Sequence, residues 1–258
     1  MPPATPDPSR PKKHARMLLL TGIGMVILFG GFLAVPFALR VFALEAFKMP
    51  SGSMRPSFEV GDHVFVEKLA LRSRAPRRGE AIAFKFPENR AQTFIKRVAA
   101  VPGDTLTVKD GHPWLNGWPV PRCVVGEATM PDPDAPAQKH TGTVELEFLE
   151  GSAYLTFFDA KNPFPTTDGP YTAKAGEVWV LGDNRHNSHD SPRWFEGKGG
   201  GVPLEDVIGR ALYRWLPLDR MGVVDVPVLP SWMSPLEPAF QKCLASRPPL
   251  EQTIPPSH

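Results

Sequence analysis

The sequence has little cysteine and almost no excess charge, and both features narrow the classes of protein that fit. Its two cysteines, Cys123 and Cys243, cannot form a disulfide framework and lack the spacing of a metal site. We expect free thiols, since Cys243 lies in a proline-rich tail that we expect to be loose, although an oxidising compartment would allow one bridge. The 29 basic and 27 acidic residues leave a net charge of +2, which gives no reason to expect a nucleic-acid partner.

Internal repeats are also lacking, and 31 prolines and 22 glycines are too many for a helical protein. Such a composition is typical of short strands joined by turns. Asn116-Gly117 and Glu150-Gly151 are predicted to be tight turns, whereas 126–142 and 162–170 are predicted to be loops. Alternating or apolar runs predict strands over 62–66, 81–86, 93–100, 105–108, 144–148, 153–158, 177–181 and 207–215.

One long apolar run is present. Met17 to Leu39 has no charged residue, and as a helix it would extend about 34 Å, enough for a hydrocarbon core of about 30 Å. Lys12, Lys13 and Arg16 precede it, so the positive-inside rule places the N-terminus in the cytoplasm and the rest of the chain outside. A cleavable signal peptide is the alternative, but its apolar region would be shorter and would end in a small-x-small site.

The fold class that we predict is mainly β: an antiparallel β domain tethered by one N-terminal transmembrane helix. Residues 42–47 form a shorter apolar patch, which either lies at the membrane surface or begins the first strand. The expected divisions are a disordered cytoplasmic tail (1–16), the anchor (17–39), a β-rich domain (40–225) that includes a divergent region (109–175), and a proline-rich C-terminal tail (226–258).

Three motifs follow the apolar run in order. The first reads MPSGSMRP over 49–56, the second combines Lys96-Arg97 with Pro-Gly-Asp at 102–104, and the third reads GDNRHNSHDS over 182–191. Together they resemble the bacterial type I signal peptidases, whose pattern has P-S-x-S-M-x-P, K-R…P-G-D and G-D-N-x-x-x-S-x-D-S blocks. The resemblance runs from about residue 47 to 190, with 109–175 left out.

The resemblance implies that Ser53 is the nucleophile and Lys96 the general base. A serine hydroxyl needs a base to accept its proton, and a lysine can be that base only when its amine is neutral. Burial favours the neutral amine, and Phe94, Ile95 and Val98 make an apolar setting for Lys96 plausible. Other lysines of the β region, such as Lys85, are expected to be ordinary solvated side chains.

Supporting roles come from the same resemblance. Ser188 corresponds to the serine that orients the lysine, and Ser51 together with the backbone N–H of Ser53 to the oxyanion hole. Arg97 and Asp183 correspond to a structural ion pair, and Asp190 to a supporting carboxylate. The family's arginine two residues after this carboxylate is displaced here: Pro192 takes its place and Arg193 follows, so the partner of Asp190 is left open.

The resemblance also implies where substrate binds. Two extended segments, 47–50 and 93–95, would bracket a substrate strand, so that backbone hydrogen bonds give affinity and shallow hollows admit alanine-sized side chains. Phe58 stands where an aliphatic residue is usual, which leaves the pocket shape open. The substrate-binding candidates are Phe47, Met49, Pro50, Phe58, Val64, Ala83, Phe94 and Ile95.

Two histidines near the third motif offer a different interpretation. His186, His189 and Asp190 have the residue types of a metal site or of a Ser-His-Asp set. Zinc needs a further ligand and a shaped backbone, and no other residue clearly supplies one. We therefore expect no metal and treat both histidines as bystanders.

The expected activity is that of an inner-membrane endopeptidase, with no cofactor, that removes signal peptides from exported preproteins on the far side of the membrane. Its expected partners are preproteins and the lipid bilayer, with the translocation machinery as a further candidate. Two alternatives stay open: a specialised Ser-Lys maturation peptidase with one dedicated substrate, and a membrane-tethered scaffold of the same fold without activity.

Overall fold

The computed structural model describes residues 16–28, 30–32, 43–132, 135, 138–161 and 167–256, and the chain forms two compact units, Met1–Leu44 and Glu45–His258. Within the first unit, residues 16–28 and 30–32 are helical. Among the described residues, no helix is both long and apolar enough to cross a membrane. The predicted tail up to residue 15, and residues 29 and 33–39 of the predicted anchor, lie outside the described residues.

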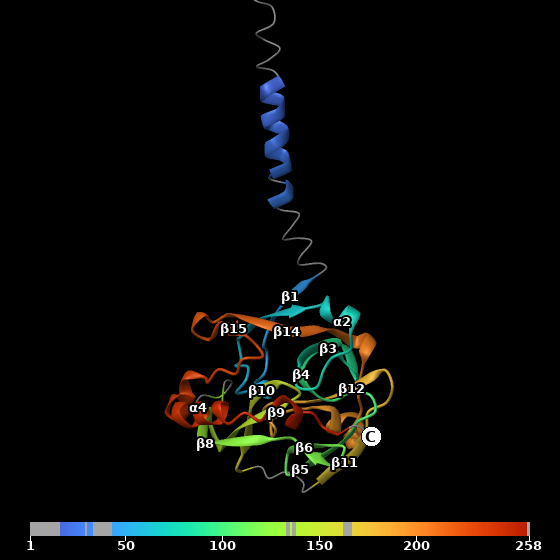
Figure 1. The fold of residues 1–258 in the computed structure, drawn as a ribbon, viewed down its shortest axis with the longest axis vertical. Helices are drawn as coiled ribbons and strands as arrows, with labels where there is room; N and C mark the ends of the chain where they lie inside the picture. The colour runs from blue at the N-terminus through green and yellow to red at the C-terminus, as the bar shows by residue number, and fades with distance from the viewer. Residues whose placement is uncertain are drawn as a thin grey trace, which may run out of the picture. The chain divides into compact units, whose positions relative to one another are not determined.

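The second unit is built mainly of antiparallel strands, as predicted (Figure 1). Its largest sheet has the order β1-β2-β14-β3-β4-β12-β13, with β15 paired to β14. The short apolar patch at 42–47 contributes to its first strand. The bounds are β1 Leu44–Lys48, β2 His63–Glu67, β3 Ala81–Phe86, β4 Asn89–Ala100, β12 Glu177–Leu181, β13 Val202–Pro203, β14 Val207–Leu216 and β15 Gly222–Val223.

Two smaller sheets complete the strands, in the orders β10-β9-β8 and β11-β5-β6-β7. They lie side by side in the part of this unit farther from β14 (Figure 1). The bounds are β5 Thr105–Lys109, β6 His112–Leu115, β7 Trp118–Pro119, β8 Arg122–Pro131, β9 Lys139–Leu149, β10 Ser152–Asp159 and β11 Thr167–Thr172.

The prediction of loops over 126–142 and 162–170 is wrong in part. β8 continues to Pro131, β9 already begins at Lys139, and β11 begins at Thr167. Thr129 and Thr141 face each other across the pair, with their hydroxyls 3.1 Å apart. These strand ends are polar and largely exposed, so they lack the apolar alternation on which a strand prediction depends.

Both predicted tight turns are confirmed. Asn116 and Gly117 have φ values of 53° and 78° between β6 and β7, and Glu150 and Gly151 have 47° and 84° between β9 and β10. Two successive residues with positive φ are what a two-residue hairpin turn with the right-handed strand twist requires.

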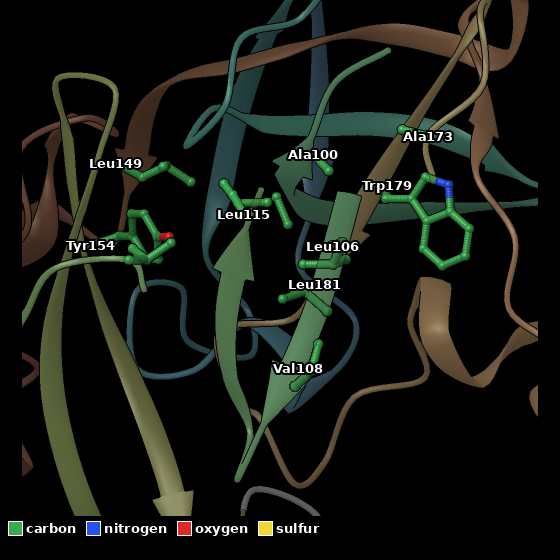
Figure 2. Packing of buried hydrophobic residues seen from close by; sticks show 11 residues of the cluster. Ala100, Leu106, Val108, Leu115, Leu149, Tyr154, Ala173, Trp179 and Leu181 are labelled. Carbon is green, nitrogen blue, oxygen red and sulfur yellow. The ribbon is translucent and has the colours of Figure 1, made fainter. Parts of the chain in front are cut away.

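A buried apolar cluster joins the two small sheets to the large one. Figure 2 shows Leu106, Leu115 and Leu181 gathered between the strands, with Tyr154 on one side and Trp179 on the other. The cluster fixes β12 against β5 and β6, and β12 leads directly into the third motif. Its buried members are Ala99, Ala100, Leu106, Val108, Leu115, Val120, Leu149, Tyr154, Ala173, Trp179 and Leu181.

Helices are short, and most of them connect strands. The α-helices of the second unit are α2 Ala70–Ser73, α3 Trp194–Gly197 and α4 Glu237–Ala245. Single turns of 3-10 helix occur as η1 Gly52–Met54, η2 Ser191–Arg193, η3 Leu204–Asp206, η4 Leu218–Arg220 and η6 Leu250–Gln252, with the longer η5 at Ser231–Leu236.

The expectation of a loose C-terminal tail with a free Cys243 is wrong. α4 packs beside β8 (Figure 1), Phe240 is buried, and Cys243 forms a disulfide with Cys123 at a Cα separation of 5.6 Å. Phe240, Cys243 and Leu244 are three and four residues apart, so they share one face of the helix. The prolines that suggested a loose tail lie on both sides of this face in the sequence, and Pro238 stands at the start of α4, where proline is tolerated.

Candidate active site

The first motif forms a closed loop between β1 and β2, which we call the Ser53 loop (residues 49–62). Met49 N–H donates to Asp62 O at 2.8 Å and Gly61 N–H donates to Met49 O at 2.9 Å, so the two ends of the loop meet. Met54 and Phe58 are fully buried beneath it. Ser53 therefore sits on a short turn of 3-10 helix, η1, whose position is fixed from both ends and from below.

Lys96 reaches Ser53 from the large sheet. It lies on β4 opposite Ile82 of β3, is 3% exposed, and places Nζ 2.5 Å from Ser53 Oγ. The Phe94 ring centroid lies 5.6 Å from the same nitrogen. Burial lowers the pKa of Lys96 to about 8, although the negative charges of Asp190 and Asp183 act in the opposite direction. A substantial fraction of this amine is thus neutral at mildly alkaline pH.

Ser51 adds a second hydroxyl at the same place. Its Oγ lies 3.2 Å from Ser53 Oγ, and its side chain faces the open side of the loop. A hydroxyl here is close enough to hydrogen-bond to an oxygen on a carbon atom that is attached to Ser53 Oγ.

The third motif closes the site from the opposite side, and a glycine makes the approach possible. A Cβ added at Gly182 would lie 2.1 Å from Ser188 Oγ and 2.7 Å from Ser53 O. Only a residue without a side chain allows these two serines to pack so closely here. Ser188 is buried, at 3% exposed.

Asn184 was given no role from the sequence, although it lies within the third motif. Its N–H donates to Ser53 O at 3.1 Å, and its Nδ2 donates to Gly52 O at 3.2 Å. These bonds fix the peptide groups on both sides of the Ser53 α-carbon. The signal that could have identified it was the motif itself, since an asparagine in a turn offers both a donor and an acceptor to nearby backbone.

Arg97, next to Lys96, belongs to the structural side of β4. It forms a two-point ion pair with Asp183, at 2.8 Å from Nε and 2.6 Å from Nη2, and donates from Nη1 to Gly79 O at 2.8 Å. The guanidinium carbon lies 3.9 Å from the Tyr154 ring centroid. Every side of this buried cation is thus satisfied, and the pair ties β4 to the start of the third motif.

Asp190, whose partner the sequence left open, contacts a backbone group, and the positive charges of Lys96 and Arg193 also act on its carboxyl. Its Oδ2 accepts from Gly182 N–H at 3.0 Å, and burial raises the pKa of its carboxyl. Ser191 Oγ accepts from Val180 N–H at 2.9 Å. The third motif thus folds back on the strand that precedes it, which positions Ser188 against Gly182.

A groove of about 390 Å³ runs beside the hydroxyls of Ser51 and Ser53 and the amine of Lys96. Five of the predicted substrate-binding residues line it: Phe47, Met49, Pro50, Phe94 and Ile95. The others, Phe58, Val64 and Ala83, do not line it and instead lie in the buried cluster that also holds Met49 and Ile95. Sequence reasoning missed two exposed members of the lining, Asn187 and His189.

The two histidines of the third motif take different positions. His186 Nδ1 accepts from Asp159 N–H at 2.7 Å, and burial lowers the pKa of its ring. His189 is exposed, with Nε2 3.2 Å from Glu88 Oε2. Within the described part of the chain, no group of three histidine, cysteine or acidic residues is arranged to hold a metal ion.

Comparison with known proteins finds relatives that match most of the chain. The family described as signal peptidase, peptidase S26, matches residues 21–216. A signal peptidase I from Leptolyngbya laminosa is 32% identical over 88% of this chain and 93% of its own length. One from Pseudomonas aeruginosa is 32% identical over 82% of this chain and 78% of its own. A crystal structure of a signal peptidase I from Enterococcus faecalis V583 is 26% identical, covering 53% of this chain and 97% of that chain, with a TM-score of 0.30.

The match over most of the chain defines a peptidase, a hydrolase of the serine endopeptidase class. The chain belongs to the signal peptidase family, peptidase S26.

Proposed function

We propose that this protein removes N-terminal signal peptides from exported preproteins, with Ser53 as the nucleophile and Lys96 as the general base. The observation that carries the proposal is the 2.5 Å separation of Lys96 Nζ and Ser53 Oγ, together with a lysine pKa of about 8. A neutral amine at hydrogen-bond distance can accept the hydroxyl proton, which an ammonium cannot.

The reaction proceeds in two halves. Lys96 Nζ accepts the proton of Ser53 as Oγ bonds to the scissile carbonyl carbon, and the resulting ammonium returns that proton to the departing amine nitrogen as the C–N bond breaks. The signal peptide is then held as an ester on Ser53. Lys96 next accepts a proton from water, whose oxygen attacks the ester carbon, and the released serine regains its proton.

Three neighbouring groups support these steps. Ser51 Oγ–H and the backbone N–H of Ser53 are the proposed donors to the oxyanion, and the two bonds from Asn184 hold the peptides that carry this site in place. Ser188 is proposed to orient Lys96. Asp190 acts at longer range, since its charge stabilises the ammonium that forms during each half-reaction.

Substrate is proposed to bind as an added strand in the groove, between residues 47–50 and 93–95. Backbone hydrogen bonds would supply most of the affinity, and the hollows between Phe47, Met49 and Ile95 would accept small side chains at the first and third positions before the cut. Phe58, Val64 and Ala83 would set the depth of these hollows from below, because they pack against the lining residues.

The membrane tether and the topology belong to the same proposal. Residues 17–39 are proposed to span the inner membrane once, with residues 1–16 in the cytoplasm and the β domain, including 109–175, on the outer face. The uncharged run and the basic residues that precede it support this topology. There the enzyme would meet preproteins as they emerge, next to the bilayer and the translocation machinery.

The test uses the full chain in detergent with a preprotein, and the cut is mapped by mass spectrometry. Cleavage at a signal-peptide boundary is expected, with none by Ser53→Ala. Uncut preprotein would favour a scaffold without activity, and cleavage of one preprotein among many would favour a dedicated maturation peptidase. For topology, protease added to spheroplasts should digest the region after Leu39, and protection of that region would contradict it.

A further inference from the structure

Arg55, two residues after Ser53, is a cation buried behind the catalytic groups. It is 3% exposed, its Nη1 donates to Pro131 O at 2.5 Å, and its Nε lies 2.7 Å from Glu59 Oε2. Its side chain also packs on the backbone before Ser53, because a Cβ at Gly52 would lie 3.3 Å from Arg55 Cδ. A shift of Arg55 would therefore move, or release, the peptide that carries the nucleophile.

Glu59 and Arg55 are both held by one side chain from the other end of the chain. Trp232 Nε1 donates to Glu59 Oε1 at 3.0 Å, and the guanidinium carbon of Arg55 lies 5.5 Å from the Trp232 ring centroid. Each of the three residues thus contacts the other two. The Glu59 carboxylate contacts Arg55 and Trp232, and the Arg55 guanidinium lies over the Trp232 ring. Arg55 and Glu59 are only four residues apart, but Trp232 is 173 residues from Glu59, so both contacts of Trp232 are tertiary.

Trp232 is itself fixed by the C-terminal segment, residues 231–256. Met233 and Phe240 are buried against the β8–β10 sheet, and Leu236 lies so close to Gly126 of β8 that a Cβ there would be 2.9 Å from its Cδ2. The Cys123–Cys243 disulfide then links the end of α4 covalently to β8.

The β8–β10 sheet beneath this segment also contacts the Ser53 loop and the third motif. Ser57 Oγ of the Ser53 loop donates to Leu155 O at 2.9 Å. Phe157 N–H donates to Asp183 O at 3.0 Å, and Arg185 N–H donates to Phe157 O at 3.1 Å. Strand β10 thus contacts the Ser53 loop and the third motif at once, and the C-terminal segment is packed on the sheet that aligns them.

We propose that Trp232 is a positioning residue for Ser53, acting through Glu59 and Arg55, and that the Cys123–Cys243 disulfide holds the segment that carries it. The proposal rests on the function proposed above. Replacing the indole takes one donor from Glu59 and removes the ring that Arg55 packs against, and the freedom gained by Arg55 is transmitted to Gly52 and Ser53. Misplacement of a reacting group by about 1 Å can cost on the order of a hundredfold in rate.

The experiment compares Trp232→Phe with Trp118→Phe in the full chain in detergent. Trp118 is a matched control, because it is also half-buried and packs on a different cluster, that of Figure 2. For Trp232→Phe we expect kcat on a preprotein to fall about tenfold, with KM within about twofold and with the pH of half-maximal rate unchanged. For Trp118→Phe we expect kcat to stay within about twofold at a similar loss of thermal midpoint.

The disulfide is tested with reductant. Reduction of the wild type and the double change Cys123→Ser with Cys243→Ser should lower kcat by a similar factor, and the double variant should not respond to reductant. Circular dichroism must show that each protein stays folded. Equal kcat in Trp232→Phe and Trp118→Phe, or a kcat of the reduced enzyme equal to that of the oxidised one, would overturn the proposal.

A separate readout distinguishes this proposal from the proposed function. The rate at which a β-lactam-type inhibitor acylates Ser53, followed by intact mass, reports on the nucleophile without a preprotein. If the wild type is acylated but cuts no preprotein, the proposed substrate is wrong, and the acylation rate of Trp232→Phe still decides the role of Trp232. Slower acylation in Trp232→Phe supports that role, and an unchanged rate contradicts it.

Discussion

The two faces of β4 hold adjacent basic residues in opposite chemical situations. Lys96 points to the groove, where its amine contacts Ser53 and makes no ion pair with any residue that the structure describes. Arg97 points to the other face, where Asp183 pairs with it at two points. Both side chains are almost fully buried, at 3% and 4% exposed. The two cations are therefore buried to the same extent, and they differ in their partner, which is a hydroxyl for Lys96 and a carboxylate for Arg97.

This difference supports the proposed roles, in which Lys96 is the reactive base and Arg97 is a structural cation. A buried charge is tolerated when an opposite charge and hydrogen bonds replace water, as Asp183 and Gly79 do for Arg97. Without a contacting carboxylate, desolvation dominates and the amine of Lys96 loses its proton more easily. The choice of residue follows the same logic, because a guanidinium stays charged in any such setting.

The largest effect on activity is expected when Lys96, on the groove face of β4, is replaced by arginine, the residue type at position 97 on the other face. Lys96→Arg keeps a positive charge but cannot accept a proton from Ser53. We expect kcat/KM for a preprotein to fall by a factor on the order of a thousand or more, as in Ser53→Ala. Single-turnover cleavage followed by gel densitometry measures it.

Lys85→Arg is the matched control, because Lys85 lies on the neighbouring strand β3 and is exposed. It should keep near-native activity. Circular dichroism should show that Lys96→Arg is folded. A folded Lys96→Arg protein with more than about a tenth of native activity would show that Lys96 acts as an electrostatic clamp and not as a base.

On the structural face, removal of one partner should cost stability. Arg97→Met leaves Asp183 buried without its cation, and breaking such a pair costs about 3–5 kcal/mol in the free energy of unfolding. The double change Arg97→Met with Asp183→Leu should recover part of this loss. Urea titration followed by fluorescence gives the values.

Arg122→Met is the control for this loss, because Arg122 is 40% exposed in its pair with Glu145 and should contribute less than about 1 kcal/mol. Equal losses in Arg97→Met and Arg122→Met would contradict the structural role of the Arg97–Asp183 pair.

The sequence predicts more about the residues beside the groove than about the rest of the molecule. Ser53 and Lys96 stand in compact motifs, and a nucleophile paired with a lysine has a chemical meaning that can be read from residue types alone. The strand alternation and the two-residue turns are local patterns too, and both were predicted correctly. These features depend on neighbours in the chain.

The contacts that depend on distant segments could not be predicted. Trp232 meets Glu59 across 173 residues, and Cys123 meets Cys243 across 120, and no local pattern encodes either pairing. The proline-rich composition around α4 suggested a loose tail. The packed face of this short helix offers only four apolar residues, Ala239, Phe240, Cys243 and Leu244, as a helical pattern. Likewise Phe58, Val64 and Ala83 were placed in the groove, although tertiary packing buries them beneath it.

A smaller effect should follow from pH, and its sign comes from Lys96. In the proposed mechanism the active form is the neutral amine, so activity should rise as pH increases through about 8 and fall as pH decreases. Each pH unit well below the pKa should lower kcat/KM about tenfold. A rate measured from pH 6 to 10 that is flat, or that is highest near pH 6, would rule out a lysine base with this pKa.

The smallest effect is expected from Asp190 of the third motif, through its influence on the pKa of Lys96. Asp190 raises the pKa of Lys96 by its negative charge, against the larger effect of burial. Asp190→Asn removes the charge but keeps an oxygen that can accept from Gly182 N–H. The ammonium loses support, so the pKa of Lys96 should decrease and the acidic limb of the rate profile should move to lower pH.

At pH 7 the rate of Asp190→Asn, expressed as a fraction of its own plateau rate, should therefore be roughly two- to fivefold higher than the same fraction for the wild type. This is the size expected when the pKa of Lys96 decreases by a fraction of a unit. Rates normalised to each enzyme's plateau above pH 9 separate this shift from any loss of kcat. Asp168→Asn, on the half-exposed part of β11, serves as a control that should leave the limb in place. A limb that moves to higher pH, or does not move, would show that Asp190 only shapes the loop through Gly182 and leaves the charge of Lys96 unaffected.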